Sequence, residues 1–530
     1  MRFARAPLAA CMLWAACPAA WAATYAVGPG QQYTQLSSLF SSVDLAPGDV
    51  VLVRGGTTYN GGIVVGSNDS GTAASPVVIR WDGQGGSRPR LQGGTHTIKF
   101  QQSNHVVFEG FEITGGSSSC LFSEAHDVVV RNVLIRDCPG HGILGADQNS
   151  GSFTLEYSEV RNAGSGSSRH PIYMQSDEVT WPGSVFRMRF NYVHSGNGGN
   201  LLKNRHERAE IHYNWFEGAA YQALELIGPD CATQQPGWNA NLRREDADVV
   251  GNVIVHTGTW RNAIRLGGDL DGRSQGRVRL VNNTIIFDRS GTSNAVLVQL
   301  GLGSLEMHNN LIHQTGSGAL SIVAENPASN VEAPSCGPSS REPWSDGRKV
   351  AGSNNWVPSN AGAVPAEWTG TLRGSDPLLT GIAQRALRPR VDSPLVSAGN
   401  PSPLSPSAFP FPSPLALPLF DPPLRAILAA GTQQPRQYGV RIDIGALESP
   451  VQAQPRRLNG NQPLVPGTGG SASAPVASPL RSLPHPVASA EAEVNVAPSM
   501  ADVRIDPPIL VAWKRVRDWL AVVLDAEAAR

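Results

Sequence analysis

The segment that decides the fold is Arg187-Met-Arg-Phe-Asn-Tyr-Val193, and related segments recur on both sides of it. Apolar residues alternate with polar ones in each copy, which is typical of a β-strand with one buried face. The other copies are Val107-Phe-Glu-Gly-Phe-Glu-Ile113, Val129-Val-Arg-Asn-Val-Leu-Ile135, Thr154-Leu-Glu-Tyr-Ser-Glu-Val160, Glu210-Ile-His-Tyr-Asn-Trp-Phe216, Asp248-Val-Val-Gly-Asn-Val-Ile254, Arg279-Leu-Val-Asn-Asn-Thr-Ile285 and Glu306-Met-His-Asn-Asn-Leu-Ile312. Their fourth residues follow one another at steps of 22 to 38 residues. A minimum step with variable insertions indicates a solenoid whose extra residues form loops.

Asparagine occupies the fifth position in five successive copies, as Asn191, Asn214, Asn252, Asn283 and Asn310. Strands of a parallel stack repeat every ~4.8 Å, so stacked Asn side chains can hydrogen-bond to one another and to turn backbone. Asn also tolerates the left-handed conformation that turns use. We therefore expect an asparagine ladder along the solenoid, with Val, Ile, Leu and Phe filling the inside of each coil.

The composition fits such a fold. Only 16% of the 530 residues are charged, Lys+Arg (42) nearly balances Asp+Glu (43), and the chain contains 56 Gly and 41 Pro. This balance excludes a nucleic-acid binder driven by bulk charge and an acidic disordered chain. No nucleic-acid partner is expected, and we expect a monomer.

The ends of the repeat region resemble those of many secreted β-helix proteins. Pro47-Gly-Asp-Val-Val-Leu-Val-Arg-Gly-Gly56 resembles their entry, and Asp443-Ile-Gly-Ala-Leu-Glu448 resembles their closing segment. With the repeat, these segments resemble the right-handed parallel β-helix of the pectin-lyase-like superfamily. The resemblance implies an all-β solenoid. Leu36, Leu39 and Phe40 lie on one face of a short expected helix that would cap the first coil.

The chain divides by composition into further segments. Arg2 and Arg5, a short apolar run and Ala20-Trp21-Ala22 are typical of a secretory signal peptide, which predicts a secreted or periplasmic protein. We expect a signal peptide at 1–22, an N-terminal cap and first coils at 23–80, β-helix coils at 81–325, a C-terminal coil and irregular cap at 326–450, a disordered Pro/Ala/Ser-rich linker at 451–506 and a short amphipathic α-helix at 507–530.

Four cysteines remain after the signal peptide, namely Cys120, Cys138, Cys231 and Cys336. An even number in an exported protein permits two disulfides. Cys120 and Cys138 are 18 residues apart, close to one repeat, so they could face each other on neighbouring coils. Buried free thiols are the alternative. The C-terminal helix, with Trp513, Val516 and Leu520 on one face, is expected either to pack on the β-helix or to dock on a membrane or protein partner.

A second set of strands precedes the asparagine-containing ones and suggests a site. Taking Ile143, Ile172, Leu202, Leu224, Ile264 and Val296 as inward residues, the next residue in each strand points outward. Neighbouring coils then bring Tyr173, Lys203, Glu225 and Arg265 into one outward row. Gln175 and Arg205 lie beside this row, and His206 and Glu207 follow at the end of the strand. Insertions after Gly228 and near Ser165 are expected to wall a groove.

This row contains the groups that β-elimination on a uronate needs: a base for the C5 proton, a cation for the carboxylate and an acid for the leaving oxygen. Lys203 or Arg205 is the candidate base. Arg265 or Arg205 would hold the carboxylate, and Tyr173, His170 or His206 would be the acid; Glu225 and Gln175 complete the substrate-binding set. The alternative is a solvated ladder of opposite charges that stabilises the strands modestly.

A resemblance to the chondroitinase B and alginate lyase family adds to this interpretation. Gly199-Asn-Leu-Leu-Lys-Asn-Arg-His-Glu207 and His212-Tyr-Asn-Trp-Phe216 resemble the coil with that family's basic catalytic residue. The resemblance implies that Arg205 occupies the position of the family's Lys. The family's catalytic Arg lies on the next coil, where this chain has Glu225 or Leu226, so the sequence departs from the family there.

We therefore predict an exported lyase acting on an acidic, uronate-containing polysaccharide. A non-catalytic carbohydrate-binding or cell-envelope β-helix protein is the alternative, as are a C5-epimerase and a glycoside hydrolase. Hydrolysis would need two carboxylates at about 6.5–9.5 Å, for which Glu225 with Glu207 or Asp230 are the candidates. Asp269 and Asp271 are candidate Ca²⁺ ligands, with an ordinary turn as the alternative, and no other cofactor is expected.

Overall fold

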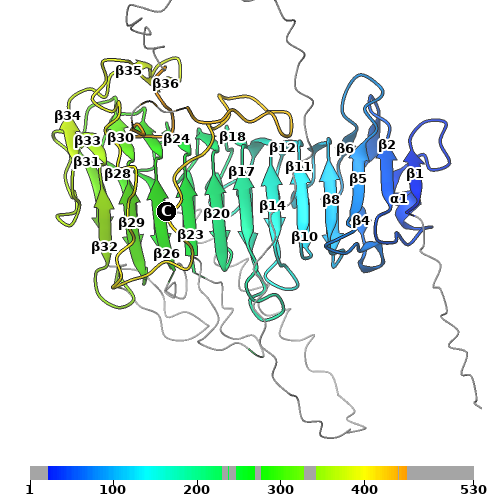
Figure 1. Ribbon diagram of the computed structural model, residues 1–530. Coiled ribbons are helices and arrows are strands. Elements are labelled where there is room, and N and C mark those ends of the chain that lie inside the picture. The colour runs from blue at the N-terminus through cyan, green and yellow to red at the C-terminus, as the bar shows by residue number, and fades with distance from the viewer. Residues whose placement is uncertain are drawn as a thin grey trace, which may run out of the picture. The chain divides into compact units, whose positions relative to one another are not determined.

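A computed structural model describes residues 22–228, 237, 246–268, 276–326, 342–437, 439 and 441–450. In this part of the chain the strands form three long parallel sheets (Figure 1). Within each sheet a strand pairs with the strand three places along the sequence, except that β1 pairs with β2 and β33 with β34 at the two ends. The chain visits sheets A, B and C in turn, so one strand from each makes one coil. Parallel crossovers of this kind are right-handed. The predicted right-handed parallel β-helix is confirmed.

Sheet A consists of β1 (Thr24–Val27), β2 (Val50–Val53), β5 (Val77–Trp81), β8 (Val106–Glu109), β11 (Val128–Arg131), β14 (Phe153–Glu156), β17 (Phe186–Arg189), β20 (Arg208–His212), β23 (Asp246–Val250), β26 (Arg277–Val281), β29 (Ser304–His308) and β32 (Val350–Ser353). Sheet B consists of β3 (Thr58–Asn60), β6 (Arg90–Gln92), β9 (Glu112–Thr114), β12 (Leu134–Cys138), β15 (Glu159–Ala163), β18 (Tyr192–His194), β21 (Trp215–Glu217), β24 (Val253–His256), β27 (Thr284–Phe287), β30 (Leu311–Gln314), β33 (Trp356–Pro358) and β34 (Leu372–Gly374).

Sheet C consists of β4 (Ile63–Val65), β7 (His96–Gln101), β10 (Ser119–Glu124), β13 (His141–Gly145), β16 (Ile172–Gln175), β19 (Leu202–Arg205), β22 (Leu224–Ile227), β25 (Asn262–Gly267), β28 (Ser293–Gln299) and β31 (Leu320–Glu325). The remaining elements are the helix α1 (Leu36–Phe40), the 3₁₀ turn η1 (Ser67–Asp69) and the antiparallel pair β35 (Leu379–Gly381) and β36 (Ala386–Pro389).

Alternating side chains fill the inside of the coils. The six residues that the sequence predicts to be inward in sheet C, from Ile143 to Val296, are fully buried. They belong to one continuous apolar core that also takes Val, Leu, Ile, Phe and Met side chains from sheets A and B. Stacked coils bury a face that no single coil could bury alone, which is why the repeat is needed for stability.

The asparagine ladder lies between sheets A and B, and its prediction is confirmed. The Asn214 side chain donates from Nδ2 to the Oδ1 of Asn252 at 3.0 Å, and the Asn214 backbone N–H donates to the same oxygen at 2.8 Å. The pattern repeats from Asn191 to Asn310 and continues to Asn355, which the sequence comparison missed. Asn355 lies 45 residues after Asn310, a longer step than any between the other copies, so the repeat pattern does not reveal it.

The left-handed residue of this turn is the residue before the ladder, contrary to the sequence expectation. Tyr157, Phe190 and Tyr213 have φ values of 50°, 59° and 57°. Their rings stack outside the coils, with centroids 5.0 and 5.2 Å apart. A non-Gly residue costs energy in this conformation, and the ring stack together with the ladder bonds holds it there.

Both ends of the described β-helix are capped. At the N-terminal end, α1 buries Leu36 and Leu39, which confirms the predicted cap helix. At the C-terminal end, the irregular segment reaches back along sheet B, where Leu387, Leu395 and Ile444 pack on outward apolar residues. The carbonyl oxygens of Asp443 and Gly445 accept hydrogen bonds from Asn282 Nδ2, which fixes this closing segment on the coils.

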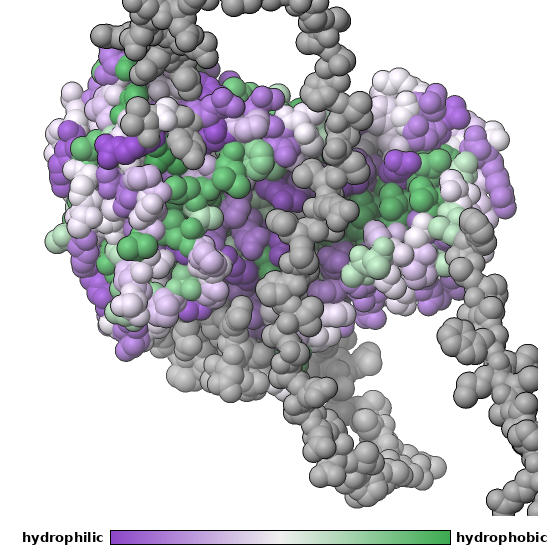
Figure 2. Space-filling model, in the orientation of Figure 1, coloured by the Kyte–Doolittle hydropathy of each residue, from purple (hydrophilic) through white to green (hydrophobic). Residues whose placement is uncertain are grey.

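A Pro-rich strap, residues 405–420, crosses the outer face of sheet A (Figure 1). Arg279 is fully buried there between Asp248, at 2.6 Å, and the ring of Phe411, whose centroid is 3.7 Å from the guanidinium. The strap therefore buries the charge ladder at the C-terminal half of this face. Figure 2 shows hydrophobic side chains over β2, β5 and β8 on the same face, where the outward residues Val50, Val78 and Val107 are in register.

Cys120 and Cys138 form a disulfide across successive coils, with Cα atoms 5.9 Å apart. Of the two alternatives for this pair, a disulfide or buried free thiols, the structure shows the disulfide. Several other predictions concern residues outside the described part of the chain: nearly all of the signal peptide, Cys231 and Cys336, the linker at 451–506 and the helix at 507–530. The chain divides into the units Met1–Gln454 and Pro455–Arg530. Among the described helices, none is long and apolar enough to cross a membrane.

Candidate functional site

The predicted outward row exists in the register that the sequence alternation gives. On the outer face of sheet C, Tyr173 of β16 pairs with Lys203 of β19, Lys203 with Glu225 of β22, and Glu225 with Arg265 of β25. Gln175 and Arg205 are paired in the adjacent outward row. We call Tyr173, Lys203, Arg205, Glu225 and Arg265 the Tyr173–Lys203 cluster.

A buried carboxylate joins the two cations of the row. Glu225 is 4% exposed, and its carboxylate lies 2.7 Å from the Arg265 guanidinium and 3.8 Å from Lys203 Nζ. Asn200 Nδ2 donates to the same carboxylate at 2.6 Å. A buried charge persists only where partners compensate it. Glu225 therefore fixes the positions of Lys203 and Arg265 relative to each other.

Arg205 and Lys203 are two outward residues of β19 that approach the same phenol. Arg205 Nε donates to the hydroxyl oxygen of Tyr173 at 3.0 Å, and Arg205 Nη1 donates to the carbonyl of Gly228 at 2.6 Å. The Nζ of Lys203 lies 5.3 Å from the centre of the Tyr173 ring. Arg205 is only 3% exposed, whereas Tyr173 is partly exposed. The phenol is thus the part of this group that reaches the surface, and Arg205 orients it from below.

A polar ladder borders the cluster and supplies its imidazoles. The Nδ1 of His141 accepts from the His170 N–H at 3.1 Å, and the Nδ1 of His170 accepts from the Asn200 N–H at 2.9 Å. The ring of His170 meets the Tyr173 ring edge-on, with centroids 5.5 Å apart. Burial lowers the pKa of His141 to about 4, so its ring is neutral at neutral pH. The predicted residue His170 therefore lies against Tyr173.

The sequence comparison missed His141, Asn200 and Gln222 as members of this ladder. Each stands two residues before an inward residue of sheet C, just as His170 does. That common offset is a signal that the sequence contains. The prediction used only the outward residues that follow each inward position, so the residues two places before it were not considered.

Two predicted positions have surroundings that the strand pattern does not convey. His206 is fully buried at the turn from sheet C to sheet A, and its ring centroid lies 5.8 Å from that of the core residue Phe186. Burial lowers the pKa of His206 to about 3. Gln175 remains beside the row and donates to the Gly145 carbonyl at 3.4 Å. The structure thus brings His170, and not His206, to the phenol.

The carboxylates considered for hydrolysis have separate surroundings. Glu207 is 2% exposed, and its Oε2 accepts from the Gly183 N–H at 2.6 Å in the loop before β17. Asp230 lies outside the described residues, as do Asp269 and Asp271. Within the described ranges, no group of three or more His, Cys, Asp or Glu is arranged to hold a metal ion. Of the two predicted walls, the one near Ser165 forms a short bridge between Ser165 and Arg169.

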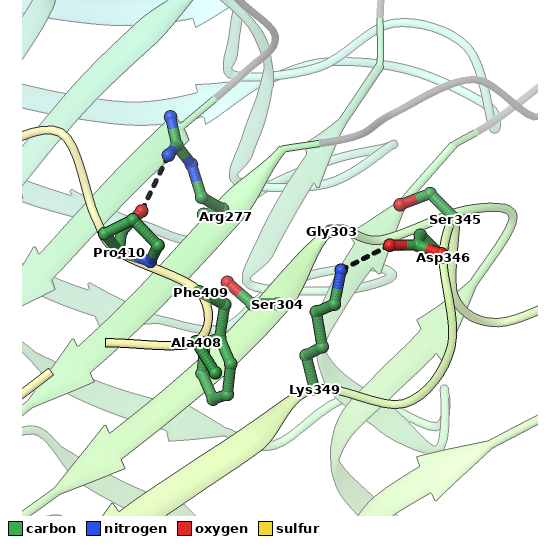
Figure 3. A pocket seen from close by; sticks show the side chains of 9 residues that line it. All are labelled: Arg277, Gly303, Ser304, Ser345, Asp346, Lys349, Ala408, Phe409 and Pro410. Atoms are coloured by element: carbon green, nitrogen blue, oxygen red, sulfur yellow. Dashed lines mark hydrogen bonds and ion pairs between the residues drawn. The ribbon is translucent and has the colours of Figure 1, made fainter. Parts of the chain in front are cut away.

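A cavity of about 500 Å³ lies elsewhere, beside the strap (Figure 3). Its cations are already engaged: Lys349 pairs with Asp346 at 2.8 Å, and Arg277 donates to the Pro410 carbonyl at 2.7 Å and pairs with Asp246 at 2.6 Å. The residues that the sequence predicts for a site lie on sheet C and do not line this cavity.

Comparison with known proteins gives likenesses at the level of structure. No family model matches the chain, and no curated protein matches it. Among solved structures, the pectate lyase Pel9A is 14% identical with a TM-score of 0.48, over 81% of this chain and 96% of that one. An alginate lyase from Paenibacillus sp. str. FPU-7 is 15% identical with a TM-score of 0.36, over 57% and 98% of the two chains. A mannuronic acid specific polysaccharide family 6 lyase from human gut microbiota is 12% identical with a TM-score of 0.38, over 69% and 86%.

Proposed function

We propose that this protein is an exported polysaccharide lyase that cleaves a uronate-containing polysaccharide by β-elimination at the Tyr173–Lys203 cluster. The observation that carries the proposal is the convergence of three different groups on one partly open face. Arg205 donates to the Tyr173 hydroxyl at 3.0 Å, Lys203 Nζ lies 5.3 Å from the same ring, and His170 packs against its edge. A solvated charge ladder would not need a buried arginine aimed at a phenol.

The reaction defines what these groups would do. A base takes the C5 proton of the uronate, and the electrons of the C5–H bond form the C4–C5 double bond. The C4–O bond breaks, and its electrons leave with the glycosidic oxygen, which takes up a proton. A cation beside the carboxylate stabilises the charge that develops in the transition state.

We assign these roles to the residues by position. Lys203, as the neutral amine, is the base that takes the C5 proton, Tyr173 is the acid that protonates the leaving oxygen, and Arg265 holds the uronate carboxylate. Arg205 and His170 orient the phenol, because one bonds its oxygen and the other packs on its ring. General acid–base groups act from within hydrogen-bond reach of the atoms that react. The assignment therefore requires the uronate to lie across Tyr173 and Lys203.

The test is turnover of a panel of uronate polysaccharides, with and without Ca²⁺, followed by the ultraviolet absorbance of the unsaturated uronate product. Lys203→Ala and Tyr173→Phe are expected to lower the rate by about 10²-fold or more, in the range that positioned acid–base groups contribute. Arg187→Ala is the matched control, because Arg187 pairs with Glu210 at 3.1 Å on the outer face of sheet A. Equal rates in Lys203→Ala and Arg187→Ala would refute the site.

A second candidate, a non-catalytic carbohydrate-binding β-helix protein, is favoured by one observation. Both cations of the row contact Glu225, so part of their charge is already balanced within the protein. A binding protein would retain a polysaccharide on this face without changing it. Binding of a polymer that Lys203→Ala weakens, with no product formed from any member of the panel, would support this alternative.

Export is part of the proposal. The Cys120–Cys138 disulfide supports it, because disulfides persist in oxidising compartments such as the periplasm and the extracellular medium. Expression of the full chain in a host with a secretory pathway should give a product that begins near Ala23. A cell-associated product that retains Met1 to Ala22 would contradict the signal peptide.

A further inference from the structure

The outward row of sheet C continues beyond the Tyr173–Lys203 cluster toward the N-terminal coils. Tyr173 pairs with Leu144 of β13, Leu144 with Phe122 of β10, Phe122 with Lys99 of β7, and Lys99 with Val64 of β4. Lys99 and Lys203 are thus four strands apart on one straight row. At the spacing of parallel strands, this is about 19 Å.

The two directions along the row differ in exposure. Toward the C-terminal coils, Glu225 and Leu297 are buried, with 4% and 7% of their surface exposed, and only Arg265 between them is partly exposed. Toward the N-terminal coils, Leu144, Phe122 and Lys99 are all partly exposed, and Val64 is 44% exposed. A polymer bound at the cluster would therefore find an open face on the N-terminal side.

The exposed part of the row has an aromatic platform beside a cation. The rings of Phe122 and His96 stack with centroids 4.6 Å apart. Lys99 Nζ lies 5.3 Å from the centre of the Phe122 ring and 2.8 Å from Glu124. His96 Nδ1 also shares a hydrogen bond of 2.8 Å with Ser119 Oγ, which holds the imidazole in place. The arrangement resembles that of Lys203 over Tyr173, with the two rings two strands apart and the two lysines four strands apart.

We propose that Lys99, Phe122 and Leu144 form a binding track for the acidic polysaccharide strand on the N-terminal side of the cluster. The proposal rests on the proposed function, because it takes the polymer from that site. The apolar faces of sugar rings would pack on Phe122 and Leu144. Lys99 would meet a carboxylate of the same polysaccharide about six strand spacings from the carboxylate that Arg265 holds at the cluster.

A track of this length would bind a polymer more tightly than a short saccharide. A saccharide that covers only Tyr173 and Lys203 cannot reach Phe122, whereas a long strand can contact both. Loss of the Phe122 ring should therefore weaken the binding of long chains and leave short ones unaffected. Because Phe122 lies outside the cluster, its replacement by Ala should raise KM and the dissociation constant for long chains and leave kcat unchanged.

The test measures binding of polygalacturonate and alginate, as long polymers and as disaccharides, by calorimetry with the full chain. Phe122→Ala is expected to bind the long polymer about tenfold more weakly, whereas Phe122→Tyr keeps the ring and retains affinity. Leu404→Ala is the control, because Leu404 is an apolar side chain that is 83% exposed. Circular dichroism checks the fold, and Lys99→Gln replaces Phe122→Ala if the latter is unfolded.

The outcomes separate this track from the lyase proposal. Weaker polymer binding in Phe122→Ala without any unsaturated product would support the track and refute the lyase. Turnover that Lys203→Ala abolishes, with equal affinity in Phe122→Ala and the native protein, would support the lyase and overturn the track. Failure of the native protein to bind either polymer, or equal losses for disaccharide and polymer, would also overturn the track.

Discussion

Replacement of Asn252 by Ala tests the asparagine ladder at a central position. The Oδ1 of Asn252 accepts from the backbone N–H and the Nδ2 of Asn214, at 2.8 and 3.0 Å. The Nδ2 donates to the Ile211 carbonyl at 2.7 Å and to Asn283 Oδ1 at 3.0 Å. Asn252 is fully buried, so water cannot replace these partners. Alanine removes all of them at once.

The expected cost follows from these bonds. A buried N–H left without an acceptor costs about 1–3 kcal/mol, and each further bond lost adds about 1 kcal/mol. The change removes one acceptor of a buried N–H and three further bonds, so it should lower the free energy of unfolding by about 4–6 kcal/mol. Asn252→Asp should not rescue it at neutral pH, because a carboxylate cannot donate to the Ile211 carbonyl. Asn68→Ala is the control, since Asn68 is exposed and makes one long side-chain bond, of 3.3 Å, to Asp44.

Hydrogen exchange is the suitable assay, because a solenoid opens locally and a single unfolding transition is not assured. A loss of about 3 kcal/mol or more should speed exchange of the Asn214 amide by about 10²-fold or more. Urea unfolding followed by circular dichroism gives the global effect. Exchange at Asn214 that is as slow in Asn252→Ala as in Asn68→Ala would refute the ladder as a source of stability.

Three further predictions follow from other parts of the structure. Burial lowers the pKa of His141 to about 4, so only the unfolded chain binds this proton between pH 6.5 and 4 and stability should fall as the pH falls through that window. Across this pH window His141 should lower the free energy of unfolding by about 3 kcal/mol. His141→Asn should largely remove this loss from the pH dependence of thermal unfolding, and an unchanged pH dependence would contradict the prediction. Reduction of the Cys120–Cys138 disulfide, which closes an 18-residue loop, should destabilise the protein by about 3 kcal/mol, and Cys120→Ala with Cys138→Ala should lower the urea midpoint correspondingly. Arg205→Lys should lower kcat more than it raises KM, because it loses the donor held 3.0 Å from the Tyr173 hydroxyl; an effect on KM alone would show that Arg205 binds substrate and does not orient the phenol.

The sequence predicted the fold because its repeat contains two independent periodicities. Alternation within each strand identified the inward residues, and the recurring Asn identified the turn. Both are local patterns that survive insertions. Asn355 was missed because its coil follows a 45-residue step. The left-handed residues were misplaced by one position because some are aromatic, such as Phe190 and Tyr213, and because Asn282 and Asn309 each stand directly before a ladder asparagine.

The candidate site was predictable in register but not in environment. Counting strands brought Tyr173, Lys203, Glu225 and Arg265 into one row, because strand pairing preserves alternation. It could not show that His206 turns into the core, since the path between two sheets depends on packing. It also gave no sign that the strap would cover the similar charge ladder of sheet A, because those contacts join residues more than 100 positions apart.

Mass spectrometry of the products formed in oxygen-18 water tests the central claim most directly. β-Elimination at the Tyr173–Lys203 cluster breaks the C4–O bond without adding water. We therefore expect unsaturated oligosaccharides that lack oxygen-18 when they are analysed before the reducing-end hydroxyl exchanges with water, and that disappear in Lys203→Ala but not in Arg187→Ala. Products that carry oxygen-18 would show hydrolysis, and a polymer that is bound but returned intact would show a binding protein or an epimerase; either result would contradict the account.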